Sequence, residues 1–301
     1  MCDFFDMGDW TIIEAPTGLG TDRRGSAAAP EWLMLNSRLV GEVRRIDVSD
    51  LRNVGFVSNG VRDYANVLAF NERLREEVVW LMSKGKRVLT IGGDHSIALG
   101  SVAGVLEQNA NVGVIWFDAH GDINTEATSP SANAHGMPVA ALMGLCKSGI
   151  NDIATNHLKP QNIFWVGARD LDPGEFETIK QLGIEDNVYS TERVHELGME
   201  AVMEDIKRKM EAQGVEAIHL SFDVDGMDPS IVWATGTRVE NGLMSEDLEA
   251  FIVGLHKLPE MKSMDFVEYN PLLDDEDKTT GKWCVKTLMR IVDSLKSKGN
   301  R

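Results

Sequence analysis

Three chemically active side chains recur at every second position in the segment WFDAHGDINT, residues 116–125. They are Asp118, His120 and Asp122, and they follow the apolar run VGVIWF directly. Side chains two residues apart lie on the same side of an extended chain. The spacing therefore predicts one cluster of carboxylates and an imidazole, groups that carry protons or bind metal ions.

Two further apolar runs end in the same kinds of residue. RVLTIGGDHS leads into Asp94 and His95, and AIHLSFDVDGMDP leads into Asp223, Asp225 and Asp228. Each segment alone is compatible with an ordinary turn or a helix cap. Asp223 and Asp225, like Asp118 and Asp122, share one side of an extended chain. Together the three strand ends are therefore predicted to bring these four carboxylates and two imidazoles, those of His95 and His120, to one place.

Such a cluster needs compensation, because neighbouring carboxylates repel one another and raise one another's pKa values. Two divalent cations carry four positive charges and would balance four carboxylates. Mixed carboxylate and imidazole ligands suit manganese, with zinc, iron or cobalt as alternatives. Two such ions can also bridge one water and make it a nucleophile at neutral pH. The sequence therefore predicts a binuclear metal site.

The elements that would position these residues alternate along the chain. Short apolar runs bounded by turn residues predict six buried strands, namely WTIIEA, RVLTI, VGVIWF, IFWVG, AIHLSF and SMDFV. Helical spacing of apolar residues predicts helices over residues 64–83, 199–210 and 245–256. This alternation predicts an α/β protein whose parallel sheet is covered on both faces and binds ligands beyond the carboxyl ends of its strands.

The net charge of the chain limits the classes of molecule that it is expected to bind. The 301 residues carry a formal net charge of −17, which repels nucleic-acid phosphates and anionic lipid, so neither is expected as a partner. The same charge favours solubility and could steer a small cationic substrate. Three cysteines without a C-x-x-C pair, and an N-terminus unlike a signal peptide, predict a cytoplasmic protein.

The motifs GGDHS, DAHGDINT and SFDVDGMDPS resemble those of the ureohydrolases, the family of arginases and agmatinases. The resemblance continues in order over nearly the whole chain through NAHGMP, VGARDLDPGE, ATGT and DFVEYNP. It implies a single three-layer α/β/α domain over residues 1–301, with a mainly parallel sheet of about eight strands. It also implies a homo-oligomer, either a trimer or a hexamer.

The resemblance further implies two Mn²⁺ ions per chain, with Asp118 and Asp223 bridging them. The six ligands would be His95, Asp118, His120, Asp122, Asp223 and Asp225. Asp122 would also carry a proton to the leaving amine. His135 would shuttle protons at the mouth of the site, and Glu268 would pair with a guanidinium. The alternative for His135 is a helix-capping or core histidine, and the alternative for Glu268 is a surface salt bridge.

Beyond the metal motifs, the chain resembles arginases around the amino-acid end of the substrate. The residues that would hold the α-carboxylate and α-ammonium are Asn124, Ser131, Asn133, Asp172 and Glu175, and ATGT adds Thr237. The implied enzyme is a metal-dependent amidinohydrolase that converts L-arginine to ornithine and urea.

Two features depart from the family pattern. Ala132 stands where arginases usually have glycine, and the loop over residues 233–242 carries Trp233, Arg238, Glu240 and Asn241. A bulky indole and two charges near the site could reshape the pocket. One alternative is therefore an agmatinase, a guanidinobutyrase or an amidinohydrolase for a modified arginine. Another is a catalytically idle regulatory or binding subunit.

Overall fold

The computed structural model describes residues 5–258 and 260–296. Its centre is an eight-stranded sheet in the order β10-β9-β8-β11-β12-β7-β2-β4, in which all neighbours are parallel. The strands are β2 (Trp10–Ala15), β4 (Val43–Arg45), β7 (Arg87–Gly92), β8 (Val112–Phe117), β9 (Ile163–Val166), β10 (Val188–Tyr189), β11 (Ala217–Asp223) and β12 (Met261–Val267). The predicted α/β class with a parallel sheet of about eight strands is confirmed.

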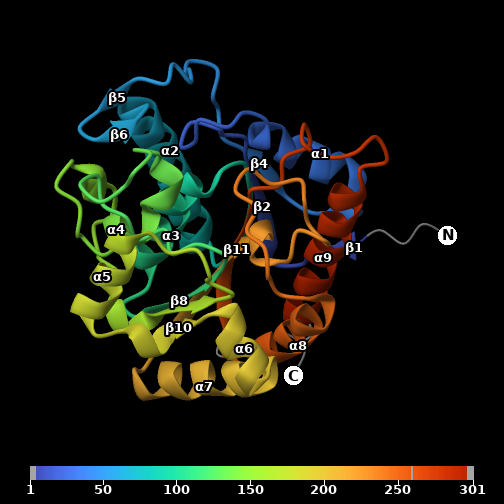
Figure 1. Cartoon of the computed structure of the whole chain (residues 1–301). Coiled ribbons are helices and arrows are strands. Elements are labelled where there is room, and N and C mark those ends of the chain that lie inside the picture. Colours follow the sequence, from blue (N-terminus) through green and yellow to red (C-terminus); the bar gives the residue numbers. More distant parts are fainter. Residues whose placement is uncertain (1–4, 259, 297–301) are drawn as a thin grey trace.

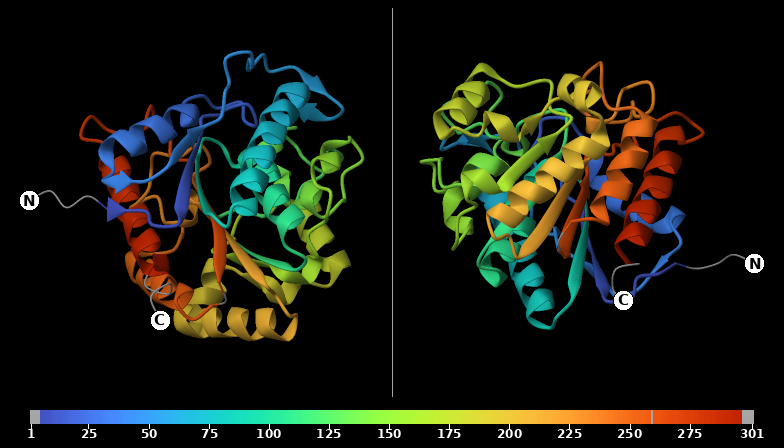
Figure 2. Two further views of the ribbon diagram at one scale, coloured as in Figure 1. Left: turned by 180° about the vertical axis from the view of Figure 1, so that it is seen from behind. Right: turned by 90° about the horizontal axis from the view of Figure 1, so that it is seen from below.

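Helices cover both faces of this sheet and bury a separate apolar core on each (Figures 1 and 2). One face carries α1 (Ala29–Asn36), α6 (Thr191–Leu197), α7 (Met199–Ala212), α8 (Ser245–Leu255) and α9 (Thr279–Lys296). The other carries α2 (Tyr64–Ser83), α3 (Ala98–Gln108), α4 (Pro138–Leu142) and α5 (Pro173–Leu182). The predicted three-layer arrangement is therefore confirmed.

All six predicted strands and all three predicted helices are present. The sequence missed β4 and β10 at the two sheet edges, which have three and two residues, too few to show a pattern. It also missed two small sheets of two-residue strands. They pair β1 (Phe5–Asp6) with β3 (Leu39–Val40), and β5 (Val57–Ser58) with β6 (Val61–Arg62).

The register of the central strands brings their carboxyl ends to a common edge. Phe222 is paired with Phe117 on one side and with Phe266 on the other. The three rings stack, with centroids 4.4 Å apart for Phe117 and Phe222 and 5.3 Å apart for Phe222 and Phe266. The residues that follow these rings, among them Asp118 and Asp223, must therefore emerge side by side.

The turn after β7 depends on a close backbone approach. A Cβ atom at Gly93 would lie 1.7 Å from the carbonyl oxygen of Thr17, so only glycine fits there. Asp94 then accepts the backbone N–H of Ser96 at 2.9 Å and that of Gly20 at 3.1 Å. Asp94 therefore caps the short helical turn that begins at His95. His95, and not Asp94, is left available at the carboxyl edge of the sheet.

Within residues 5–258 and 260–296, no helix combines the length and the apolar character that crossing a bilayer requires.

A buried tryptophan links the sheet to the segment after β8. Trp165 Nε1 donates to the carbonyl oxygen of Gly121 at 2.8 Å. Nε1 of Trp116, its neighbour in register on β8, has no hydrogen-bond partner among the described residues. Trp165→Phe leaves a buried carbonyl unpaired, so we expect it to lower the free energy of unfolding by roughly 1–3 kcal/mol more than Trp116→Phe does. Urea unfolding in the presence of a chelator measures both. Equal losses in the two variants would contradict this role.

Candidate metal centre and substrate cavity

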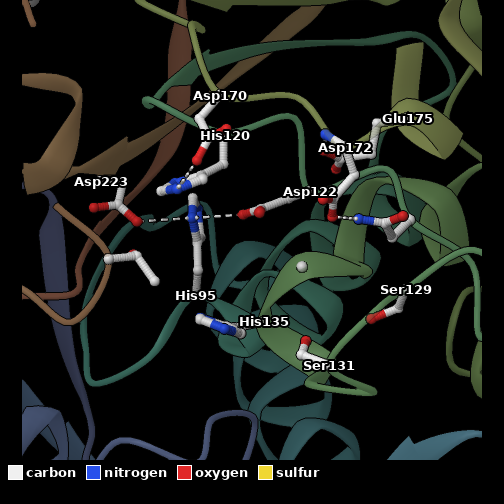
Figure 3. Close-up of a pocket in the computed structure, with 13 residues that line it drawn as sticks. His95, His120, Asp122, Ser129, Ser131, His135, Asp170, Asp172, Glu175 and Asp223 are labelled. Carbon is white, nitrogen blue, oxygen red and sulfur yellow. Dashed lines mark hydrogen bonds and ion pairs between the residues drawn. The ribbon is translucent and has the colours of Figure 1, made fainter. Parts of the chain in front are cut away.

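His95 lies at the centre of the first ligand group, at the carboxyl ends of β7, β8 and β11 (Figure 3). Its Nδ1 is 2.9 Å from Asp118 Oδ2, 3.1 Å from Asp122 Oδ2 and 3.2 Å from Asp223 Oδ2. Two segments of the chain, the one after β8 and the end of β11, thus direct three carboxylate oxygens at one ring nitrogen of a third segment.

The other side of the His95 ring fixes its orientation. Nε2 lies 2.7 Å from Ser221 Oγ, and the ring stacks on Trp116 with centroids 4.2 Å apart. Nδ1 and Asp118 Oδ2 are both buried, and within the described part of the chain neither makes a hydrogen bond of acceptable geometry despite their 2.9 Å separation. Unpaired buried polar atoms are costly, and lone pairs that converge on one point are what a cation requires. These residues therefore fit a metal ion.

The second group lies beside the first and shares a carboxylate with it. His120 Nδ1 is 3.3 Å from Asp118 Oδ1 and 3.2 Å from Asp225 Oδ2. The two groups that could hold a metal ion are His95, Asp118 and Asp223, and Asp118, His120 and Asp225. Asp118 belongs to both, which is the arrangement that a bridging carboxylate needs. Its two oxygens face different groups.

Backbone amides and a hydroxyl hold the carboxylates in place. Asp118 Oδ1 accepts the backbone N–H of His120 at 2.7 Å, and Asp223 Oδ1 accepts that of Asp225 at 2.8 Å. Asp225 in turn accepts the backbone N–H of Ala119 at 3.2 Å and the hydroxyl of Thr237 at 3.0 Å. Such secondary contacts orient metal ligands. The hydrogen bond from Ala119 to Asp225 also fixes the segments after β8 and β11 relative to each other.

The electrostatics of the cluster reflect its burial. Burial and the neighbouring Asp118 raise the pKa of Asp122 to about 6, and burial with Asp225 and Asp118 raises the pKa of Asp223 well above its usual range. Burial alone would lower the pKa of His95, but the surrounding carboxylates outweigh it and raise that pKa well above normal. The chain itself therefore supplies too little positive charge for its carboxylates unless the imidazoles take up protons.

Asp122 is held in an unusual backbone conformation, with φ of 50°. The residues on both sides of it are tied down: Gly121 accepts from Trp165, and the backbone N–H of Ile123 donates to Glu175 Oε1 at 3.0 Å. Non-glycine residues reach positive φ at a cost and keep it where surrounding contacts impose it. The conformation lets Asp122 turn back toward His95 (Figure 3).

A cavity opens above the two groups. Its lining residues are His95, His120, Asp122, Asn124, Ser129, Ser131, His135, Gly136, Asp170, Asp172, Glu175, Asp223 and Thr237 (Figure 3). Five of the six predicted substrate contacts lie in this wall. Sequence reasoning missed Ser129 and Asp170, although each stands two residues before a predicted contact, Ser131 or Asp172.

The hydroxyl protons of Ser129 and Ser131 have no acceptor among the described residues. Ser129 Oγ accepts the backbone N–H of Ala132 at 3.1 Å, and Ser131 Oγ accepts that of Asn133 at 3.2 Å. With the acceptor role filled in this way, each hydroxyl can donate its proton into the cavity. This wall is therefore suited to an anionic group such as a carboxylate.

Carboxylates lie on the opposite wall (Figure 3). Asp172 Oδ2 accepts from Asn124 Nδ2 at 2.8 Å, and Asp170 is largely exposed at the cavity, with Oδ2 4.0 Å from His120 Nε2. Glu175 is buried, and its second oxygen accepts the backbone N–H of Asp172 at 2.9 Å. Burial, with the nearby Asp122, raises the pKa of Glu175 to about 8. Asp170 and Asp172 are therefore the groups placed to attract a cation, and Glu175 braces the wall.

Two residues predicted to contact the substrate, Asn133 and Glu268, do not line the cavity. Asn133 Oδ1 accepts from Arg62 Nε at 2.7 Å, and its Nδ2 donates to Asp22 at 3.2 Å, so the amide faces away. Glu268, which has φ of 66°, lies behind the wall, where Oε1 accepts the backbone N–H of His95 at 2.8 Å. Both polar groups are satisfied by distant segments that a sequence pattern does not reveal.

His135 joins Glu268 to the cavity. Its Nδ1 lies 3.1 Å from Glu268 Oε1, while its ring is part of the cavity wall. Burial alone would lower the pKa of His135, but Glu268 raises it to about 9. The imidazole can therefore hold a proton at neutral pH beside the space that a substrate would occupy.

The divergent loop over residues 233–242 stays outside this wall, apart from Thr237. Trp233 packs against the apolar core on the sheet face that carries α1 and α6 to α9, and Arg238, Glu240 and Asn241 are exposed. The expectation that this loop could reshape the pocket is therefore not met in the structure, because its indole finds an apolar partner and its charges remain in solvent.

Comparison with known proteins identifies the family of this chain. The model of the arginase family matches residues 8–292. An arginase from Staphylococcus aureus (strain MRSA252) is 37% identical over 280 residues, covering 89% of this chain and 92% of that protein. An arginase from Bacillus subtilis (strain 168) is 35% identical over 301 residues, covering 96% and 97%. The crystal structure of Entamoeba histolytica arginase with L-ornithine superposes with a TM-score of 0.86 at 35% identity, covering 96% of this chain and 98% of that one. The chain therefore belongs to the arginase family.

Proposed function

We propose that this protein hydrolyses L-arginine to L-ornithine and urea with two Mn²⁺ ions per chain. The observation that carries the proposal is the pair of ligand groups sharing Asp118 at the base of a cavity whose walls differ in charge. One wall offers hydroxyl donors and the other offers carboxylates, which suits the carboxylate and the ammonium of an amino acid. The kinship with arginases supports the same conclusion.

The metal ligands in this proposal are His95, Asp118, His120, Asp122, Asp223 and Asp225. When bound, the two ions supply Lewis-acid stabilisation and a water that is ionised at neutral pH. Oxygen and nitrogen donors together suit manganese.

In this proposal, side chains of this protein carry out the proton transfers. Water adds to the guanidinium carbon, and the C–N bond to the ornithine side breaks only if the departing nitrogen receives a proton. We propose that Asp122, on the cavity floor, collects the proton from the attacking water and delivers it there. His135, with its raised pKa, then exchanges protons between the cavity and solvent. Pairing of Glu268 with the guanidinium stays a prediction, because the cavity wall does not include it.

The amino-acid end of the substrate would lie between the two walls. We propose that Ser129, Ser131 and Asn124 donate hydrogen bonds to the α-carboxylate, and that Asp172 and Asp170 attract the α-ammonium. Thr237 and Glu175 would then act mainly through Asp225 and through the backbone near Asp122. This assignment favours arginine over agmatine, because agmatine lacks the carboxylate that the hydroxyl donors would bind.

A reducing compartment is compatible with the cysteines. Cys146 and Cys284 are buried and unpaired. We therefore propose that the enzyme works in the cytoplasm.

The metal content tests the binuclear site. Protein incubated with manganese and then desalted should contain about two ions per chain, as the two-metal arrangement requires. His120→Asn should lower the content toward one, because the second ligand group loses its imidazole. His195→Asn, which changes an exposed histidine outside the cavity, is the matched control. Elemental analysis showing one ion or none in the wild type would refute two-metal catalysis and favour the idle-subunit alternative.

Replacement of His135 tests the proton carrier. His135→Asn should keep two metal ions and the thermal unfolding midpoint, yet reduce kcat roughly 10²- to 10⁴-fold, the usual effect of losing a positioned acid or base. Urea release under saturating L-arginine measures this. A variant as active as the wild type would leave His135 with a structural role only.

Substrate choice tests the arginine assignment. We expect kcat/KM for L-arginine to exceed that for agmatine by at least about 10²-fold, because the hydroxyl donors are left unpaired when the carboxylate is missing. Ser131→Ala should lower kcat/KM for arginine and leave the value for agmatine nearly unchanged. A measured preference for agmatine would overturn the arginine assignment while leaving guanidinium hydrolysis in place.

A further inference from the structure

The loop that carries Ser129 and Ser131 contains a strained residue. Ala132 has φ of 58°, in the left-handed region where a Cβ atom costs roughly 1–2 kcal/mol. Its backbone N–H is the one that Ser129 Oγ accepts, and the next backbone N–H, that of Asn133, is accepted by Ser131 Oγ. The turn at Ala132 therefore sets the direction of both hydroxyls that face the cavity.

A single arginine outside the cavity, Arg62, makes hydrogen bonds to three residues of this turn. The backbone N–H of Arg62 donates to the carbonyl oxygen of Ala132 at 2.8 Å. Its Nε donates to Asn133 Oδ1 at 2.7 Å, and a terminal guanidinium nitrogen reaches the carbonyl oxygen of Ser131 at 3.4 Å. Three consecutive loop residues are thus bound by one residue that lies about 70 positions away in the chain.

Arg62 is itself held in place by a tight hairpin. It ends β6 in the β5–β6 hairpin, whose turn residues Asn59 and Gly60 have φ of 51° and 74°. Positive φ at both central residues is the tight hairpin turn that Asn-Gly favours. The other terminal guanidinium nitrogen of Arg62 donates to the carbonyl oxygen of Gly55 at 3.3 Å within the same loop. The Arg62 side chain is therefore bound both to its own hairpin loop and to the Ala132 turn. Asp22 accepts a hydrogen bond from the other end of the Asn133 amide.

We infer that Arg62 is a positioning residue for recognition of the substrate's α-carboxylate. Arg62 does not line the cavity, so it acts through the Ala132 turn by keeping the hydroxyl protons of Ser129 and Ser131 directed at the ligand. The inference rests on the proposed function, because it assigns those hydroxyls to the carboxylate. It adds that the specificity of the site depends on a hairpin outside it.

The test compares Arg62→Gln with Arg73→Gln in manganese-loaded protein. Arg73 loses the same charge but pairs with Asp50 and contacts no part of the loop over residues 129–133. We expect Arg62→Gln to raise KM for L-arginine roughly 10-fold, the equivalent of about one hydrogen bond, with kcat within about twofold of the wild type. Inhibition by L-ornithine should weaken by a similar factor. Inhibition by 1,4-diaminobutane, which lacks the carboxylate, should not change.

Two further variants separate positioning from charge and from misfolding. Arg62→Lys keeps the charge but loses the guanidinium fork, so it should resemble Arg62→Gln. Asn133→Ala removes the acceptor of Arg62 Nε and should also raise KM. Adding Ala132→Gly to Arg62→Gln should restore part of the lost affinity, because glycine adopts the left-handed turn without strain. Metal content and unfolding midpoint verify the fold of each variant.

The outcomes are distinct. If the wild type hydrolyses L-arginine and Arg62→Gln binds arginine and ornithine as Arg73→Gln does, the inference is overturned while the proposed function stands. Full activity of Arg62→Lys would assign the effect to charge and overturn positioning. Equal weakening of ornithine and 1,4-diaminobutane would remove the link to the carboxylate. A wild type that does not cleave L-arginine would overturn the proposed function, and the inference with it.

Discussion

Four buried carboxylates at one edge of a parallel sheet are the constraint on which this structure depends. Asp118, Asp122, Asp223 and Asp225 lie together and are almost completely buried, so water screens them little. Such a cluster is costly unless positive charge is brought to it. The aromatic stack of β8, β11 and β12 keeps the strand ends in register, so the carboxylates cannot move apart to relieve the repulsion. The sheet thus supplies a rigid, electron-rich site whose natural complement is a pair of cations.

The backbone contributes to the site as directly as the side chains do. Asp122, Ala132 and Glu268 all have positive φ, and none of them is a glycine. Each is fixed by contacts from elsewhere: the segments flanking Asp122 by Trp165 and Glu175, the Ala132 turn by Arg62, and Glu268 by the amide of His95. Strain of this kind is retained where surrounding packing imposes it, and it places functional groups where relaxed backbone would not.

In the proposed function, metal-dependent catalysis and recognition of the substrate's amino-acid end depend on different parts of the molecule. The residues proposed to bind the metal ions lie at or just beyond strand ends, whose positions are set by a sheet buried on both faces. The groups proposed to recognise the amino-acid end lie on loops, and these are positioned by side chains from α5 and from the β5–β6 hairpin. Loops tolerate change better than buried strands do, so substrate preference could vary in this family while the metal chemistry is preserved.

The sequence by itself determined the six predicted strands and the types of residue that follow them, because these follow from local spacing and hydrophobicity. Asp122 joins the cluster only through a positive-φ backbone that contacts with Trp165 and Glu175 impose. Tertiary structure alone decided which polar groups face the cavity. Asn133 turns to Arg62, and Glu268 lies behind His135, because each finds its hydrogen-bond partner in a segment remote in the chain. Ser129 and Asp170 join the wall for the same reason, since strand order and loop packing bring them there. Local pattern fixes which residues leave a strand on one side, but a buried polar group takes the direction of whichever distant partner satisfies it.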